Sequence, residues 1–571
     1  MNTNDFLEKM KSLLDGDPDA KIQFNDIYEP RSVAVVPEDA WRSLLVTKDG
    51  CIRYYGRYFD GRKEEYPECY IESRDCGVSW RTHFPKNKTA IGASAYVPFL
   101  DKYCAMRSAE GKGTFFYAAD SPDDTPTCVK VCDEEYIDFR LPFTLKSRNR
   151  IIVVTHERRP DEHPTCFYAV LFISDDGGKT FRKITPEIAP YYPRASENEG
   201  VRWQQNNREN SIEELTDGTL MMMSRTATDY HYVTYSKDGG DTWDKIRPSV
   251  FHSTGTMPFL KKLSDGRLLF FWCNTNLLPE LPEADGIWED VFTNRDASHC
   301  AISEDDGKTW IGLREFRLNN FRNCPDFRAR GGVSLYDGAD KSVHQFEVIE
   351  LPYDKVLVVS GQNKILRRAT IFDIKWLYEK SREEDFLLGL SNISSQVYIK
   401  SVLGGYRLGC AGHCAYNRLP SAVMMPNPNV KWREAMYLTY LDDDRLVSGV
   451  AGAVWNFPAA KKGKVVVRAK INGQPLRVTL LDHWLNPCDQ TLANDRSAIV
   501  LEKVDADDFF DYVFSFDTEN RVVSVVLPNG ETESKQLPNL PTGISYLHLQ
   551  IAATDNAEVG VHVSHLSFKA E

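Results

Sequence analysis

A repeated eight-residue segment constrains the fold of this chain more than any other feature. It occurs as SRDCGVSW from Ser73, SDDGGKTF from Ser174, SKDGGDTW from Ser236 and SEDDGKTW from Ser303. All four copies fit the pattern Ser-x-Asp-x-Gly-x-Thr/Ser-aromatic, and the last three start 62 and 67 residues apart. This spacing is long enough for a four-stranded sheet and one loop in every repeat. The sequence therefore predicts a series of similar β-sheets.

The chemistry of the octet is that of a turn. Its Asp can accept hydrogen bonds from backbone N–H groups of the same turn, and its Gly can adopt a positive φ. The closing aromatic residue is expected to pack between neighbouring sheets. A Ca²⁺ loop is the competing interpretation, but the alternating oxygen ligands and the distal Glu of such a loop are missing. We therefore assign a structural role to Asp75, Asp176, Asp238 and Asp305.

Strand-like segments surround the octets and continue beyond them. IIVVTHERR, FYAVLFIS, TLMMMSRT, RLLFFWCN and KVLVVSGQ are rich in β-forming residues, and turn signals precede several of them. After about residue 385 the octets stop, but alternating segments such as KVVVRAKI and YLHLQIAA continue. The prediction is an all-β protein with a short helical extension at residues 1–24, a six-bladed propeller at 25–384 and a β-sandwich of the concanavalin or laminin-G-like sort at 385–571.

Composition excludes several classes of protein. The net charge is −13, and nucleic-acid binding requires a clustered excess of Lys and Arg. No apolar run is long enough to span a membrane, and the first 21 residues lack the apolar region of a secretory signal. We expect a soluble, cytoplasmic protein with reduced thiols, or a secreted one if a leader has been removed. CAGHC from Cys410 lacks the spacing of a zinc or haem site, so no metal and no cofactor are expected.

The octets and their flanking strands resemble the Asp-box sialidases over about residues 25–380. This resemblance implies three arginines that hold a sugar carboxylate, a Tyr nucleophile activated by a Glu, and an Asp acid/base. RENSIEELTDGTLMMMSRT is similar to the family frame that carries the activating Glu and the second arginine, which gives Glu209 and Arg225. TNRDASHC, just ahead of an octet, gives Arg295 as the third arginine, and YEPRSVAVV gives Arg31 as the first. Guanidinium groups suit this task because they bind carboxylates in a bidentate manner and stay charged.

The family acid/base lies in the loop after the first hairpin, which is GRYFDGRKEEYPECY in this chain. Asp60 is the first candidate for this role and Glu65 the second. Arg57 at the start of the same loop is a candidate for binding substrate. Because the loop is charged throughout, a solvated surface tip is the alternative interpretation.

The sequence departs from the family at the nucleophile. In SVHQFEVIELPYDKVLVV, Gln345 or Phe346 occupies the position where the family has Tyr. Tyr336 lies about ten residues upstream and would have to reach the site from a shifted loop. The other hypothesis is an inverting mechanism, which needs only a carboxylate pair such as Asp60 and Glu209.

Polar and aromatic residues at other strand ends are further candidates for binding substrate. These are His156, Trp272, Asn274 and Gln345. A Trp can stack on a sugar and an Asn can bind hydroxyl groups, although Trp272 could equally fill the space between blades.

Three hypotheses for the function follow. The first is an exo-acting hydrolase of a terminal sialic-acid-like or other acidic sugar. The second is a glycosidase for a different uronic or neutral sugar, and the third is a non-catalytic propeller that binds glycan or protein. The expected partner is a glycan, with neither nucleic acid nor membrane. Three roles are open for the C-terminal domain: glycan binding, support of the propeller, and contacts in a homo-oligomer.

Overall fold

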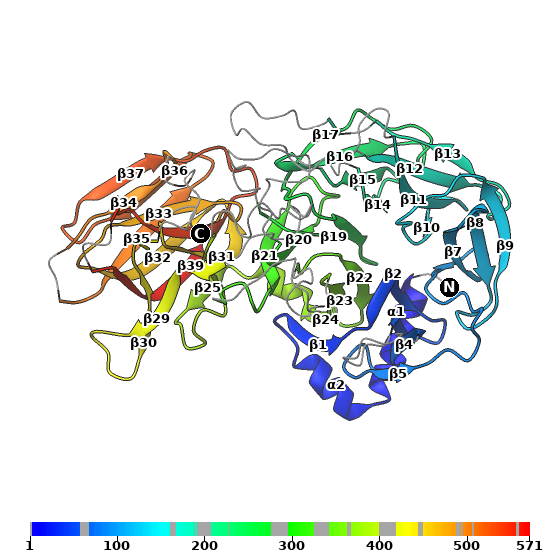
Figure 1. Cartoon of the computed structure of the whole chain (residues 1–571), viewed down its shortest axis with the longest axis horizontal. Helices are drawn as coiled ribbons and strands as arrows, with labels where there is room; N and C mark the ends of the chain where they lie inside the picture. The colour runs from blue at the N-terminus through cyan, green and yellow to red at the C-terminus, as the bar shows by residue number, and fades with distance from the viewer. Residues whose placement is uncertain are drawn as a thin grey trace.

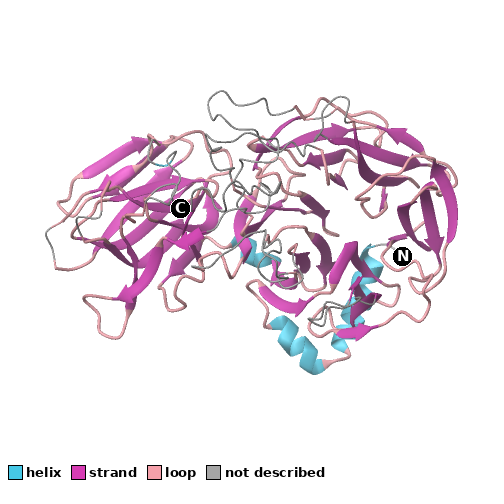
Figure 2. Cartoon of the chain, in the orientation of Figure 1, coloured by secondary structure: helices cyan, strands magenta, loops and turns pink. Residues whose placement is uncertain are grey.

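The computed structural model describes residues 3–57, 68–159, 167–187, 189–190, 207–226, 228–275, 295–324, 342–362, 367–398, 418–443, 449–486, 492, 495–504, 507–555 and 559–571. The described chain is nearly all β-structure, in two parts that lie side by side (Figures 1 and 2). Six four-stranded antiparallel sheets form a ring, and two larger sheets form a sandwich next to it. The predicted fold class, a six-bladed propeller followed by a β-sandwich, is confirmed.

Five blades each consist of four consecutive strands. Their bounds are β2 Glu38–Val46, β3 Ile52–Arg57, β4 Glu68–Ser73 and β5 Arg81–His83; β6 Ala95–Val97, β7 Lys102–Ala109, β8 Gly113–Ala119 and β9 Thr127–Cys132; β10 Phe143–Thr144, β11 Ile151–Arg158, β12 Phe167–Ser174 and β13 Arg182–Ile184; β14 Ser211–Glu214, β15 Leu220–Ser224, β16 Tyr230–Ser236 and β17 Arg247–His252; β18 Phe259–Lys262, β19 Leu268–Trp272, β20 Ala297–Ser303 and β21 Ile311–Leu318.

The sixth blade closes the ring. It contains β22 Glu347–Leu351, β23 Lys355–Ser360 and β24 Arg368–Asp373, and its outermost strand is β1 Arg31–Val35 from the start of the chain. This pairing of the first strand with the last blade ties the two ends of the propeller together. The N-terminal segment forms helices α1 Thr3–Asp15 and α2 Pro18–Asn25, and buried Met10, Leu14 and Phe24 join the apolar cluster at this closure. No helix in the described ranges is long and apolar enough to cross a membrane.

The first strand of each blade lies nearest the axis. β14 contacts β18, β18 contacts β22 and β22 contacts β2, as neighbouring inner strands must. Because the four strands alternate in direction, each blade has one face where its inner strand begins and an opposite face where that strand ends. The octets start at the last residues of the third strands β4, β12, β16 and β20, so all four lie on the face where the inner strands end.

The octets form near-identical turns. In the third copy, the Asp238 carboxylate accepts hydrogen bonds from the Thr242 backbone N–H at 2.9 Å and the Ser236 hydroxyl at 2.8 Å. The Gly240 N–H donates to the same Ser236 oxygen at 2.8 Å, and Gly240 has a φ of 100°. Asp75, Asp176 and Asp305 accept the equivalent bonds in their own copies. These bonds account for the conserved spacing within the octet without any metal.

The C-terminal part is a two-layer sandwich. Its larger sheet contains β25 Ser381–Glu384, β29 Ala422–Pro426, β30 Glu434–Leu438, β32 Lys462–Ile471, β35 Phe510–Asp517, β36 Val522–Val526, β37 Thr532–Gln536 and β39 Val561–Ala570. Its smaller sheet contains β26 Ile393–Ser394, β31 Gly452–Ala460, β33 Leu476–Leu481, β34 Ile499–Leu501 and β38 Ile544–Ile551. A separate pair is β27 Gln396–Tyr398 with β28 Arg418–Pro420. Alternate residues of β32 and β39 fill the core between the sheets.

The two parts meet near residue 380. A 3₁₀ turn, η1 Ile374–Tyr378, ends the propeller, and β25 then pairs with β39 of the sandwich. The sandwich thus begins at Ser381, four residues before the position placed at 385 from the sequence. Asn456 on β31 also donates to the Leu313 carbonyl at 3.2 Å, and its own oxygen accepts from the Glu315 N–H at 3.0 Å.

Candidate functional site

A buried carboxylate, Glu209, is the centre of the candidate site. It lies two residues before the inner strand β14, on the face opposite the octets, and its side chain is only 1% exposed. One carboxylate oxygen accepts from Arg225 Nη1 at 2.5 Å, and the other accepts from Gln345 Nε2 at 2.8 Å. Arg225 follows β15 and Gln345 precedes the inner strand β22, so three separate segments converge on this carboxylate.

Several guanidinium groups surround Glu209. Arg140 donates to the Glu209 and Asn210 carbonyl oxygens at 2.6 and 2.9 Å, and Arg208 binds Asp138 at 2.6 Å. Arg295 donates to the Gly255 carbonyl at 2.8 Å. Each of these residues lies at the face of the ring where inner strands begin.

The guanidinium groups are close enough together to lower the pKa of Arg225. Burial lowers the pKa of Arg225 to about 10; the Glu209 carboxylate opposes this change, while Arg295 and Arg208 add to it. Arg225 therefore remains protonated at neutral pH but sits in a field of like charge. The guanidiniums of Arg140, Arg208, Arg225 and Arg295 thus lie at one face of the ring, together with the carboxylates of Glu209 and Asp138. Such a concentration of guanidinium groups suits an anionic ligand, although the whole chain is acidic.

The backbone at the site is unusual. Asp138, Asn207, Glu209 and Gln345 have positive φ values of 54°, 59°, 59° and 71°. Each lies shortly before an inner strand, β10, β14 or β22. Non-glycine residues in this region carry conformational strain, which proteins tend to keep where the position of a side chain matters for function. The strained backbone aims the Glu209 and Gln345 side chains at each other.

A cavity of about 230 Å³ lies beside this cluster, between the inner strands. Arg140 lines it together with Glu213 of β14, Lys261 of β18 and Glu347 of β22. Burial raises the pKa of Glu213, and nearby Lys261 only partly opposes the rise. Glu347 accepts hydrogen bonds from the Ser43 and Leu44 N–H groups of the first blade at 2.6 and 2.8 Å, which closes the wall of the cavity.

The structure brings together three of the residues expected to bind or act on substrate, and a fourth lies beside them. Glu209, Arg225 and Gln345 are in direct contact, and Arg295 belongs to the same charged cluster. Arg295 lies near the residue that follows Arg225: a Cβ at Gly255 would lie 3.7 Å from the Thr226 carbonyl and 3.9 Å from Arg295 Nη2.

Arg31 is placed elsewhere, which corrects the prediction of a pocket role. It lies on β1, the outermost strand of the sixth blade, and is half exposed beside Asp26, 3.2 Å away. The prediction assumed that the first strand of the sequence is an inner strand. Closure of the ring by β1 makes β2 the first inner strand.

Two predicted sugar contacts are also corrected. Trp272 is fully buried between blades, where its ring packs against Phe251 and Phe270. Asn274 is buried as well, and its side chain donates to the Asp482 carbonyl of the sandwich at 2.7 Å. Both residues therefore serve packing and the domain interface.

His156 and Arg57 lie on the same face as Glu209 but in other environments. His156 is buried edge-on against Phe167, and its Nε2 lies 3.6 Å from Asp138 Oδ2. Through Asp138 it reaches Arg208 and the edge of the cluster. Arg57 is exposed at the end of β3. Asp60, Glu65, Tyr336 and the CAGHC segment lie outside the described residues.

The sequence analysis missed Arg140, Arg208 and Asp138. Their signal is positional, since each stands within five residues before an inner strand, as Glu209 and Gln345 do. The first inner strand, β2, carries Arg42 in RSLLVTKDG and does not include Arg31. An alignment of RSLLVTKDG with NSIEELTDG, the inner strand and turn of the fourth blade, would have identified β2 as an inner strand.

The chain was compared with known proteins. Residues 140–336 match the family model of the BNR repeat-like domain. Among solved structures, the chain is similar to a Trypanosoma rangeli sialidase in complex with sialic acid, at 12% identity and a TM-score of 0.35 over 95% of each chain. It is also similar to the Ruminococcus gnavus intramolecular trans-sialidase in complex with oseltamivir carboxylate, at 12% identity and a TM-score of 0.36 over 62% of this chain and 96% of that one. A Dyadobacter fermentans protein of unknown function has 14% identity and a TM-score of 0.34 over 60% and 98% of the two chains. No curated protein matches the sequence.

Proposed function

We propose that this propeller, which contains a BNR repeat-like domain, is an exo-acting glycoside hydrolase that removes a terminal sugar bearing a carboxylate. The observation that carries the proposal is the buried Glu209 held by Arg225 and Gln345, with Arg295, Arg208 and Arg140 around it. A carboxylate beside several guanidinium groups is an arrangement suited to hydrolysis of an anionic glycoside.

In this proposal the guanidiniums bind and orient the substrate. The carboxylate of the sugar would neutralise the positive charge that now lowers the pKa of Arg225. Arg295 and Arg225 are the residues assigned to this anion, since both belong to the charged cluster and the charge of Arg295 acts on Arg225. A neutral sugar offers no anion for these guanidiniums to bind, so we expect acidic substrates to be strongly preferred.

Glu209 is assigned the role of general base towards water. The Gln345 amide next to it cannot attack an anomeric carbon, so the Glu–Tyr pair of the sialidase resemblance has no counterpart at this contact. A carboxylate that activates water predicts inversion at the anomeric centre, with Asp60 or Glu65, the two candidates from the sequence, as the general acid.

Turnover of fluorogenic sialosides and uronides by the full chain tests the proposal. Glu209→Gln should lower kcat by at least about 100-fold, because general base catalysis contributes about 10²–10⁴. Glu110→Gln, at an exposed carboxylate on another blade, is the matched control and should keep full activity. Following the anomeric product by NMR then identifies inversion or retention. Full activity of Glu209→Gln would overturn the assignment of the base.

A second function, glycan binding without turnover, is favoured by one observation. The Glu209 side chain is almost inaccessible and is held from both sides, as expected for a carboxylate that only positions arginines. Saturable binding of an acidic sugar by a chain inactive on every glycoside tested would support this alternative. In that case Arg295→Met should abolish binding, whereas Glu209→Gln should retain it.

A further inference from the structure

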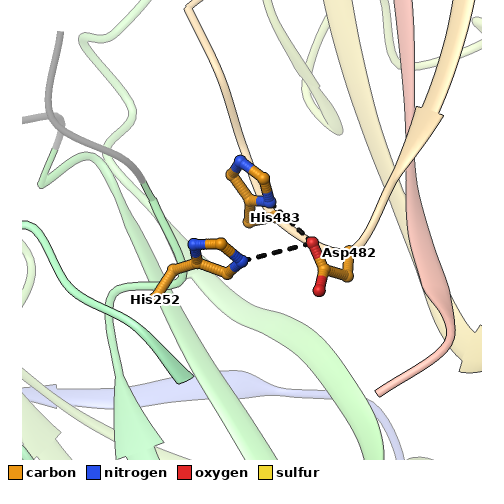
Figure 3. A group of neighbouring side chains, drawn as sticks. All are labelled: His252, Asp482 and His483. Atoms are coloured by element: carbon orange, nitrogen blue, oxygen red, sulfur yellow. Dashed lines mark hydrogen bonds and ion pairs between the residues drawn. The ribbon is translucent and has the colours of Figure 1, made fainter. Parts of the chain in front are cut away.

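A compact group of three side chains joins the propeller to the sandwich. His252 is the last residue of β17 in the propeller, whereas Asp482 and His483 directly follow β33 in the sandwich. Figure 3 shows both imidazole rings directed at one carboxylate. All three residues are buried, with 6%, 3% and 8% of their surface exposed. Nothing in the chemistry proposed for Glu209 uses this group.

The donor atoms of the group face a common point. Asp482 Oδ1 lies 2.6 Å from His483 Nδ1 and 3.3 Å from His252 Nε2. The two imidazole rings stack with their centroids 3.7 Å apart. One nitrogen from each histidine and one carboxylate oxygen lie within 4.8 Å of one another.

These distances suit a small transition-metal ion. Ligand atoms about 2.0–2.1 Å from a tetrahedral Zn²⁺ lie about 3.3–3.4 Å from each other. The His252–Asp482 distance already has this value, and the His483–Asp482 distance would have to increase by about 0.7 Å. Two imidazoles and one carboxylate form the three-ligand set of many zinc sites, which leave the fourth position to water.

The surrounding residues fix the ligands in place. The Asp482 carbonyl accepts from Asn274 Nδ2 at 2.7 Å and from Ser545 Oγ at 3.1 Å. Tyr230 packs against the His252 ring with centroids 4.7 Å apart. Such outer contacts orient ligands and raise metal affinity.

We propose that His252, Asp482 and His483 bind one divalent transition-metal ion of the zinc class that links the two domains. On binding, the metal replaces the contacts of both histidines with Asp482, and each histidine releases the proton of its ligating nitrogen or carries that proton on its other ring nitrogen. The site departs from the expectation of no metal drawn from the sequence, in which its ligands are separated by about 230 residues.

The test uses the full chain after removal of metals with a chelator. ZnCl₂ titrated by calorimetry should show saturable binding of one ion per chain, and added Zn²⁺ should raise the unfolding temperature. Co²⁺ as a second probe should give the visible absorption of a low-symmetry nitrogen and oxygen site. His252→Ala and Asp482→Asn should each weaken Zn²⁺ binding by at least about tenfold, whereas His565→Ala, a partly buried histidine on β39, should not.

Two outcomes would overturn the proposal. One is the lack of saturable one-to-one Zn²⁺ binding by the native chain, which decides the question even if a variant fails to fold. The other is native-like Zn²⁺ affinity in folded His252→Ala or Asp482→Asn, which would place the ion elsewhere. None of these measurements involves glycoside turnover, so the metal site and the hydrolase can fail independently.

Discussion

The buried pair of Arg225 and Glu209 gives a prediction about stability that can be separated from catalysis. Their side chains are 4% and 1% exposed, and the charged atoms are 2.5 Å apart. Arg225→Met removes the cation and leaves the Glu209 carboxylate buried with the Gln345 amide as its remaining partner among the contacts described above. We expect this variant to lower the free energy of unfolding by about 3–5 kcal/mol, the usual effect of breaking a buried ion pair from one side.

The double variant should recover much of this loss. Glu209→Gln together with Arg225→Met leaves no buried charge at the pair, and apolar or neutral replacements of buried ion pairs are often tolerated. We expect a coupling energy of about 2 kcal/mol between the two positions in a double-mutant cycle. The exposed pair of Arg31 and Asp26, 3.2 Å apart and 51% and 74% exposed, is the matched control. Its cycle of Arg31→Met and Asp26→Asn should give less than about 1 kcal/mol.

Urea unfolding of the four chains of each cycle measures these energies. Hydrogen–deuterium exchange of peptides from β14 and β15 assigns the relevant transition to the propeller, which is necessary because the chain has two domains. A coupling energy at Arg225 and Glu209 no larger than that of the exposed pair would refute the reasoning. It would mean that water reaches the pair and that burial does not govern the energy of this ion pair.

Further predictions concern the octets and the domain interface. Gly178→Ala would place a Cβ against the Phe116 ring, whereas Gly266, which has a similar positive φ, has open space around it. Gly266→Ala should lower the free energy of unfolding by roughly 1 kcal/mol, and thermal unfolding should show a clearly larger decrease for Gly178→Ala. The octet turn lowers the pKa of Asp238 to about 2; stability from this depressed pKa is present above about pH 4 and is lost as the pH falls towards 2. Asp238→Asn should therefore flatten the dependence of the urea midpoint on pH between 4 and 2, and an unchanged slope would contradict the assignment. Tyr546→Phe removes a buried hydroxyl that donates at 2.6 Å to the Glu315 carboxylate of the propeller. Urea unfolding should show a decrease of about 1–3 kcal/mol in the free energy of unfolding, and an unchanged midpoint would argue against this hydrogen bond.

Local chemistry made the blades predictable from the sequence. The octet carries its own hydrogen-bond partners within eight residues, so Asp238 and Ser236 form their turn whatever the remaining chain does. Strand patterns were equally local. Glu209 and Arg225 could be paired because they stand at the two open ends of one hairpin, β14–β15, where short-range geometry brings them together.

Contacts that depend on closure of the ring could not be predicted from local sequence patterns. Arg31 was misplaced because an isolated strand pattern does not show whether the strand is innermost or outermost in its blade. For Trp272 the sequence left sugar stacking and packing between blades equally open, because its burial depends on Phe251 of the neighbouring sheet. Arg140 was missed because its bond to the Glu209 carbonyl joins two blades across 69 residues of sequence.

The direction of the strands explains why the two faces of the propeller differ so strongly. Compact octet turns end the third strands on one face, which stabilises the blades and leaves their connections short. The longer connections must then occur on the other face, where Glu209, Arg225, Arg295 and Gln345 gather. The sandwich contacts this same face through His252 and Asn274, at the ends of β17 and β19. A metal or a mutation that shifts the sandwich at His252 therefore acts on the blades that carry Arg225 and Arg295, so the second domain can influence the site while contributing no residue to the charged cluster described here.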